Sequence, residues 1–315
     1  MPFRSLSEII GATSSFALVA GMAVVAAMPA QAASGTTYTV DRVSLCRNAQ
    51  TPAGGTTFEE ALAKANSNPG KDTIEFAPGL GAVDVSTCYR SGMRFVFAGD
   101  ATQSVDIVGN GVQMEGRQEF RLWLETNPTD RSPRNYSQAQ WIRHSTGFLQ
   151  VGTYGADNSD VAVSISDMRF HNLPSLVRVE HNASLAMNGI VADEINDFND
   201  TCDEPAVATD STGANITLAA VWITNSHTPG SAKSEFSGGA LVYGGSPGSG
   251  SRGNLVFDEV YLAGNEQGRA INWYGGSTTI VSSQLVDTGG MILEADNTQI
   301  VNSAFWATGL HRYAI

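Results

Sequence analysis

Several features are scarce in this chain of 315 residues, and each scarcity excludes a class of protein. Lys and Arg number 18 against 31 Asp and Glu, so the formal net charge is −13, which disfavours nucleic acids and anionic membrane surfaces as partners. The five histidines and three cysteines show no ligand spacing, so the sequence does not indicate a zinc site. Beyond residue 32, no apolar run approaches the roughly 18 residues that a membrane-spanning helix needs. The length suits one large domain or one array of repeats.

The first 32 residues are predicted to be a signal peptide. Arg4 supplies the positive start, an apolar run covers residues 16–28, and Ala30-Gln31-Ala32 is the small-x-small pattern that a signal peptidase cleaves. The alternative is a retained membrane anchor, but the apolar run is short and ends in this cleavage pattern. We therefore expect an exported protein, extracellular or at the cell surface, with the periplasm as an alternative.

An exported protein can keep disulfides, and three cysteines leave one thiol over. We expect Cys46 and Cys88 to pair because both lie in the N-terminal region. Cys202 would then be free or buried.

A bent apolar template recurs along the chain. Its first copy is Val163-x-Ile165-x-x-Met168-x-Phe170, in which two stretches of period 2 are joined where the spacing slips by one residue. Repetition at steps of twenty or more residues predicts an all-β solenoid with parallel sheets. An antiparallel β-sandwich is the alternative, but its turn signals come at shorter intervals. The further copies begin at Leu185, Ile216, Leu255, Thr278 and Thr298.

A third strand and a turn residue accompany most copies. Third strands are expected at residues 176–179, 240–243, 270–274 and 291–294, and loop insertions at about 114–145, 196–213 and 228–253. Asn and Asp tolerate left-handed backbone, so they are expected to form turns after the last apolar position of the template. These turn residues are Asn172, Asn225, Asn265 and Asp287.

A short helix is expected to cap the first turn of the solenoid, whose end would otherwise expose unpaired edges. Thr57-x-x-Glu60 is a capping box. The apolar side chains that follow share one helical face, at Phe58, Ala61, Leu62 and Ala65. Residues 33–80 are therefore assigned to the cap and the first strand, at 73–76, and residues 81–315 to the repeats.

Residues 56–79, TTFEEALAKANSNPGKDTIEFAPG, resemble the N-terminal signature of exported right-handed β-helix proteins, which is named for a Cys-Ser-Leu-Arg-Glu-Ala core. The later GGALVYGG is similar to the turns of that group, of polymorphic outer-membrane proteins and of pectin-lyase-like repeats. The resemblance implies a right-handed parallel β-helix and a surface or extracellular location. Thr56 and Glu59 depart from the signature, where the family has Cys and Arg, so the family's N-terminal disulfide is not carried over. The scaffold hosts adhesins, lyases and hydrolases, so no single activity is implied.

The first candidate site is an aromatic stripe on the third strands. Tyr243, Trp273 and Glu294 are expected to align in successive repeats, with Tyr274 beside them. If Ala270 points inward, alternation turns Trp273 and Glu294 outward, where they suit the apolar faces and hydroxyls of sugar rings. The opposite register would place Trp273 in the core.

The second candidate site pairs His171 with Asp193, at corresponding positions of adjacent repeats. An oriented imidazole suits a general base, and a surface ion pair is the alternative. Arg178 and Arg269 are candidates for the basic proton acceptor that lyases of this fold use, although no local motif singles out either.

Two further candidates lie in the expected insertions. Asp197, Asp200 and Asp203 belong to an acidic stretch that suits calcium, although EF-hand spacing is absent and a solvated acidic loop is the alternative. The 114–145 insertion is rich in arginine and tryptophan, which suit anionic or carbohydrate ligands. Its candidate ligand-binding residues are Trp123, Trp141 and Arg143, and packing over the first turns is the alternative.

Two functions from different classes follow. The first is a secreted or cell-surface protein that binds a polysaccharide or cell-surface glycan, or mediates adhesion. The second is a polysaccharide lyase or a glycoside hydrolase. No cofactor is expected, and calcium is the one metal candidate.

Overall fold

The structure is a computed structural model that describes residues 35–46, 54–85, 95–98, 104–116, 147–173, 175–195, 205–209, 212–226, 241–244, 253–264, 269–288 and 290–306. Across these ranges it is mostly β-strand, with one helix, α1 (Phe58–Ser67). No helix in these ranges is long and apolar enough to cross a membrane. Several predicted features lie outside the described residues: the signal segment, Cys88, Cys202 and Asn265.

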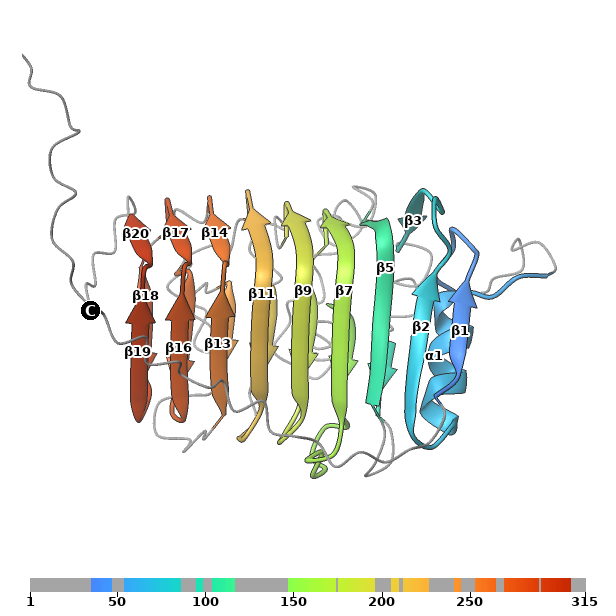
Figure 1. Ribbon diagram of the computed structural model, residues 1–315, viewed down its shortest axis with the longest axis horizontal. Coiled ribbons are helices and arrows are strands. Elements are labelled where there is room, and N and C mark those ends of the chain that lie inside the picture. The colour runs from blue at the N-terminus through green and yellow to red at the C-terminus, as the bar shows by residue number, and fades with distance from the viewer. Residues whose placement is uncertain are drawn as a thin grey trace, which may run out of the picture. The chain divides into compact units, whose positions relative to one another are not determined.

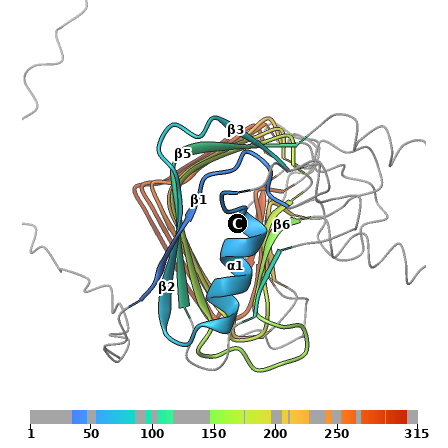
Figure 2. The same ribbon diagram turned by 90° about the vertical axis from the view of Figure 1, so that its right-hand side faces the viewer.

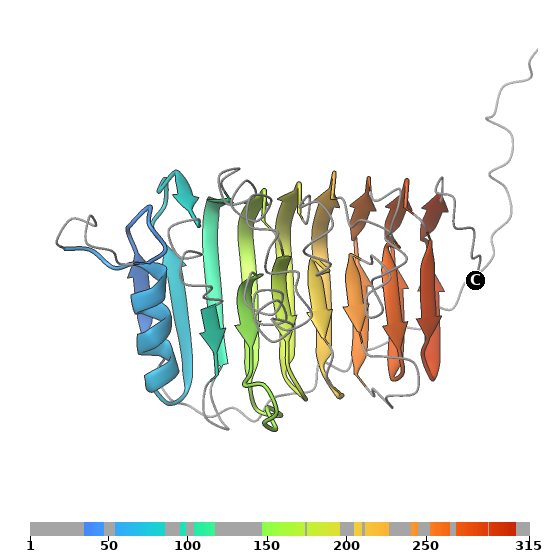
Figure 3. The same ribbon diagram turned by 180° about the vertical axis from the view of Figure 1, so that it is seen from behind.

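The strands form two sheets, and every strand pair within them is parallel. The first sheet has the order β1-β2-β5-β7-β9-β11-β13-β16-β19, with β3, β14, β17 and β20 attached along one side. The second has the order β18-β15-β12-β10-β8-β6-β4. The chain passes from one sheet to the other and back, so each strand pairs with its counterpart from the previous pass (Figures 1 and 3). One such pass is called a repeat below.

The first sheet comprises β1 (Thr37–Val40), β2 (Lys71–Phe76), β3 (Ala82–Asp84), β5 (Ser104–Glu115), β7 (Ala162–His171), β9 (Ser184–Asp193), β11 (Asn215–Thr224), β13 (Asn254–Asp258), β14 (Tyr261–Ala263), β16 (Ser277–Val281), β17 (Gln284–Val286), β19 (Asn297–Val301) and β20 (Ala304–Trp306). The second comprises β4 (Phe95–Phe97), β6 (Gly147–Val151), β8 (Ser175–Val179), β10 (Val207–Thr209), β12 (Val242–Gly244), β15 (Ile271–Tyr274) and β18 (Met291–Glu294).

The bent template sets the register of the first sheet. All six predicted copies align, in the order Val163, Leu185, Ile216, Leu255, Thr278 and Thr298. β5 is an earlier copy that the sequence pattern concealed, because its register with β7 shifts between Val108 and Val112. Asn110 and Gly111 lie in this irregular stretch with φ of 52° and 76°.

Strands β7, β9 and β11 each bend at one residue in left-handed conformation. This residue is Asp167 in β7, Gly189 in β9 and Ala220 in β11, with φ from 48° to 63°. Its backbone reverses the inward–outward alternation, which is why the apolar spacing slips there. Figure 2 shows the strands turning this corner.

A second corner follows the last apolar position, and it confirms the predicted turns. Asn172, Asn225 and Asp287 have φ of 55°, 49° and 51°. Glu194 and Gly264 occupy the same place in their own repeats, with φ of 53° and 78°. Glutamate is unusual there, because a left-handed backbone favours Gly, Asn and Asp.

The helix caps the first repeat as predicted. Thr57 Oγ1 accepts a hydrogen bond from Glu60 N at 3.3 Å, while Thr57 N donates to Glu60 Oε2 at 3.0 Å. The predicted apolar face is buried, and α1 packs against β1, β2 and β4 (Figure 2). Phe58 stacks on Phe76 and Phe148, with ring centroids 5.7 and 5.2 Å apart.

The last two template copies replace an apolar residue with serine after the first corner. Ser283 Oγ accepts from Val260 N at 3.1 Å, and Ser303 Oγ accepts from Ser283 N at 3.2 Å. Each hydroxyl also donates to a carbonyl two residues earlier, of Val281 or Val301. Since these hydrogen bonds satisfy the serine hydroxyls, the polar copies keep the register of the apolar ones.

The third strands predicted within 228–253 and elsewhere are present, and β12 corresponds to the strand expected at 240–243. The 196–213 segment, expected to be an insertion, contains the additional strand β10. β10 pairs with both β8 and β12, so it is part of the second sheet. A strand of three residues carries too little periodicity to be separated from a loop by sequence pattern alone.

Candidate functional site

Strands β14, β17 and β20 and the ends of β5, β7, β9 and β11 present two rows of outward-pointing side chains, here called the short-strand face. Between the two corners, the inward positions Phe170, Ala192 and Ile223 are at most 1 % exposed, so their neighbours on either side point outward. One outward row runs Gln113, Arg169, Val191, Trp222, Tyr261 and Gln284 across successive strands. The second row runs Glu115, His171, Asp193 and Thr224, and Ala263, Val286 and Trp306 continue it across β14, β17 and β20.

Large apolar side chains are exposed in the first row. Trp222 is 56 % exposed and Val191, on the adjacent strand, is 41 % exposed. The Trp222 and Tyr261 rings meet edge to face, with centroids 6.5 Å apart and an interplanar angle of 66°. Arg169 is exposed on the side of Val191 away from Trp222. The row thus places a cation two strands away from an aromatic surface, with Val191 between them.

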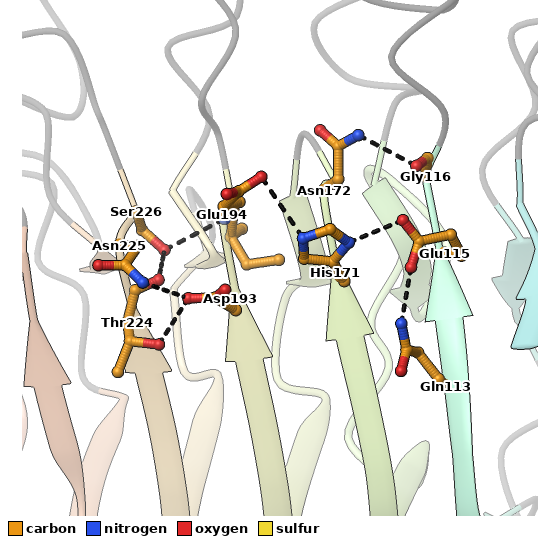
Figure 4. Close-up of polar contacts among 11 residues, drawn as sticks. Gln113, Glu115, Gly116, His171, Asn172, Asp193, Glu194, Thr224, Asn225 and Ser226 are labelled. Atoms are coloured by element: carbon orange, nitrogen blue, oxygen red, sulfur yellow. Dashed lines mark hydrogen bonds and ion pairs between the residues drawn. The ribbon is translucent and has the colours of Figure 1, made fainter.

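The predicted neighbours His171 and Asp193 are side by side in register in the second row. The imidazole itself, however, contacts two glutamates. His171 Nδ1 lies 2.7 Å from Glu115 Oε1, and His171 Nε2 lies 3.4 Å from Glu194 Oε2 (Figure 4). Sequence reasoning missed Glu115 as a neighbour because β5 was not recognised as a template copy.

The carboxylates around His171 are themselves held by neighbours (Figure 4). Gln113 Nε2 donates to Glu115 Oε2 at 2.7 Å. Asp193 Oδ1 accepts from Thr224 Oγ1 at 2.7 Å and from Asn225 Nδ2 at 2.8 Å. The two carboxylates are therefore oriented by amides and a hydroxyl of their own or the following repeat.

The electrostatic environment favours the imidazolium form of His171. Partial burial lowers the pKa of the imidazole. Its hydrogen bond to Glu115 and the negative charges of Glu115, Glu194 and Asp193 oppose this effect and prevail, so the pKa lies above the usual 6.5.

The aromatic stripe predicted on the third strands is wrong for Trp273. Its side chain is fully buried, and it pairs in register with Gly244 and Leu293 rather than with Tyr243 and Glu294. Gly244 makes room for the indole, because a Cβ there would lie 2.1 Å from two of the ring atoms. Trp273 therefore belongs to the core, although no described residue accepts a hydrogen bond from its Nε1.

The other stripe residues lie on the opposite face of the second sheet. Tyr243 aligns with Asn272 and is 2 % exposed, so it does not offer an open stacking surface. Tyr274 and Glu294 align with each other, Tyr274 half-buried and Glu294 exposed. Burying Trp273 does not bury Glu294, because the two residues are one register position apart.

Arg178 lies on the outer face of the second sheet in a buried ion pair. Its Nε donates to Glu180 Oε1 at 2.9 Å, and the two side chains are 6 % and 1 % exposed. A buried guanidinium held by a carboxylate is costly to separate from it, so the pair orders this face. The remaining ligand candidates, Trp123, Trp141 and Arg143, and the calcium candidates, Asp197, Asp200 and Asp203, lie outside the described residues. Cys46 is disulfide-bonded.

No protein-family model, curated protein or solved structure matches this chain.

Proposed function

We propose that this protein is an exported carbohydrate-binding protein that holds a glycan chain on the short-strand face. The observation that carries the proposal is the exposed ring of Trp222 in contact with the half-buried ring of Tyr261, in line with exposed Val191 and Arg169. Contiguous exposed apolar surface often marks a binding site. Aromatic rings suit the apolar faces of sugars, while neighbouring polar groups bind the hydroxyls.

The geometry of the face suits a polymer. Parallel strands are about 4.8 Å apart, so the row offers a new side chain at each such step along the sheet. Arg169 and Gln284 bracket the aromatic pair with hydrogen-bonding groups. Asp193 and Thr224, one outward position further along their strands, add carboxylate and hydroxyl partners. A glycan lying across the strands would contact several repeats at once.

Binding is favoured over the lyase or hydrolase alternative by the state of Arg178. This candidate proton acceptor is buried against Glu180, where it is poorly placed to reach a substrate proton. Release of reducing ends or unsaturated products from a polysaccharide panel would instead support the lyase or hydrolase alternative.

The proposal includes a right-handed parallel β-helix. Two stacks of parallel strands, visited alternately by one chain, support it. Crossover connections between parallel strands of one sheet are right-handed in about 98 % of cases. Export rests on residues 1–32, and amino-terminal sequencing of the secreted protein would test cleavage after Ala32.

The glycan proposal is tested with the purified protein on a polysaccharide panel, by affinity electrophoresis and then calorimetry on any ligand found. Trp222→Ala is expected to weaken binding about tenfold, equivalent to about 1.4 kcal/mol. Tyr154→Ala is the matched control, because Tyr154 is 77 % exposed and precedes β7, away from the short-strand face. Equal affinities of the Trp222→Ala variant and the unchanged protein would refute binding at this face.

A further inference from the structure

We infer that His171, Asp193 and Glu194 form a binding site for a divalent transition-metal ion of the Zn²⁺ type. Each offers one ligand atom, and these three atoms lie within 4.8 Å of one another. The site lies where β7 and β9 end, and it does not depend on the glycan proposal.

The spacing of the donor atoms fits such an ion. In a tetrahedral site with bonds of about 2.0–2.1 Å, two ligand atoms lie about 3.3–3.4 Å apart. His171 Nε2 and Glu194 Oε2 are 3.4 Å apart. Asp193 is anchored through Oδ1 by Thr224 and Asn225, which leaves Oδ2 for an ion.

The environment of His171 is that of a metal-binding imidazole. A histidine ligand usually gives its second ring N–H to a carboxylate, which fixes the ring and raises its basicity. Glu115 Oε1 occupies this place, 2.7 Å from Nδ1, and Gln113 holds the other oxygen of Glu115 (Figure 4). Nε2 is thereby directed at Glu194, so the orienting carboxylate and the ligand carboxylate lie on opposite sides of the ring.

Glu194 reaches the cluster from the second corner of its repeat. The same corner is occupied by Asn172, Asn225, Gly264 and Asp287 in other repeats, all at positive φ. Glutamate gains none of the local stability that Gly, Asn or Asp has there. Its side chain, however, is longer and reaches the imidazole of the preceding repeat. From this corner Glu194 completes the donor set.

The donor set also selects the class of ion. One imidazole nitrogen with two carboxylate oxygens suits Zn²⁺ and similar divalent transition ions, whereas Ca²⁺ and Mg²⁺ prefer oxygen ligands alone. The ligands come from adjacent repeats, 22 and 23 residues apart, so no local metal motif exists in the sequence.

The test is calorimetric titration of the purified, non-reduced protein with Zn²⁺, with Co²⁺ absorption as a second readout of histidine ligation. The unchanged protein should bind one Zn²⁺ at this site and bind Ca²⁺ far more weakly. Glu194→Asn should weaken Zn²⁺ binding at least about tenfold. It should leave the fold intact, because asparagine already occupies this corner in two other repeats. Glu115→Gln, which alters only the orienting group, should weaken binding by about 10–100-fold.

Glu259→Asn is the matched control. Glu259 is also an exposed glutamate with left-handed backbone, φ 56°, and its N–H likewise donates to a carbonyl of the following repeat. It lies outside the His171 cluster. The inference is overturned if the unchanged protein binds no Zn²⁺, if Ca²⁺ binds more tightly, or if Glu194→Asn and Glu259→Asn titrate alike.

Discussion

Replacing Gly244 with alanine tests whether Trp273 is a core residue. An added Cβ would lie 2.1 Å from Cε3 and Cζ3 of the indole and 2.8 Å from Cδ2. The ring is fully buried within the hydrophobic core. Gly244 has no positive φ, so alanine brings no backbone strain and the clash is the only adverse effect.

The size of the effect follows from opposing contributions. Overpacking a core costs about 1–3 kcal/mol, and the upper value applies because a rigid ring cannot yield. Alanine in a strand restores about 0.5–1 kcal/mol by restricting the unfolded chain. We therefore expect Gly244→Ala to lower the free energy of unfolding by about 2 kcal/mol. At about 2–4 °C per kcal/mol, the melting temperature should fall by about 4–8 °C.

The assay is thermal and urea unfolding followed by circular dichroism, in a double-mutant cycle with Trp273→Leu. In the Trp273→Leu background the clash is absent, so Gly244→Ala should be neutral or slightly stabilising. The coupling between the two positions should then be about 2 kcal/mol. If Gly244→Ala is equally destabilising in both backgrounds, or harmless in the unchanged protein, Trp273 does not pack over Gly244 and the assigned register is wrong.

Three further predictions concern the cap, the first corner and the imidazole. Thr57→Ala removes the helix cap and should lower the free energy of unfolding by about 0.5–2 kcal/mol, measured by urea unfolding. Thr57→Ser should retain most of that stability. Ala220→Gly should stabilise the protein by up to about 1 kcal/mol, because glycine accepts the φ of 48° without strain, and a lower melting temperature would contradict the corner geometry. In metal-free protein His171 has a raised pKa, so its stabilising contribution is complete below about pH 6.5 and disappears as pH rises through the folded pKa. An NMR titration should place the midpoint of His171 above pH 6.5, and a midpoint below 6.5 would refute the contribution of the carboxylates. The melting temperature of the unchanged protein should fall as pH rises through this midpoint, and His171→Gln should flatten that fall.

Much of the fold was predictable because its signals are local and repeated. The apolar spacing from Val163 to Phe170 encodes two strands and a bend, and the same spacing aligned all six copies in register. The capping box at Thr57 and the turn at Asn172 depend on side chains that hydrogen-bond nearby backbone or tolerate a left-handed φ. The copy in β5 was missed because the irregularity between Val108 and Val112 breaks the spacing.

The candidate sites were less predictable because they depend on which side of a strand is covered. His171 and Asp193 could be placed side by side from the repeat alone, since their register follows from the template. Trp222 and Tyr261 were not singled out, although the same register aligns them on one outward row. Their exposure is what distinguishes them from other outward-pointing residues, and exposure depends on what packs against a strand from elsewhere in the chain.

The sequence by itself determined the repeat, the bends, the capped end and the pairing of His171 with Asp193, because a period of apolar residues specifies inward and outward within a strand. Only the tertiary structure decided that Trp273 fills the space above Gly244, that Tyr243 is covered, and that Glu115 and Glu194 flank one imidazole. The physical reason is that third strands of three to five residues are too short to define their own register. In parallel stacking, a shift of one residue exchanges the buried and exposed faces.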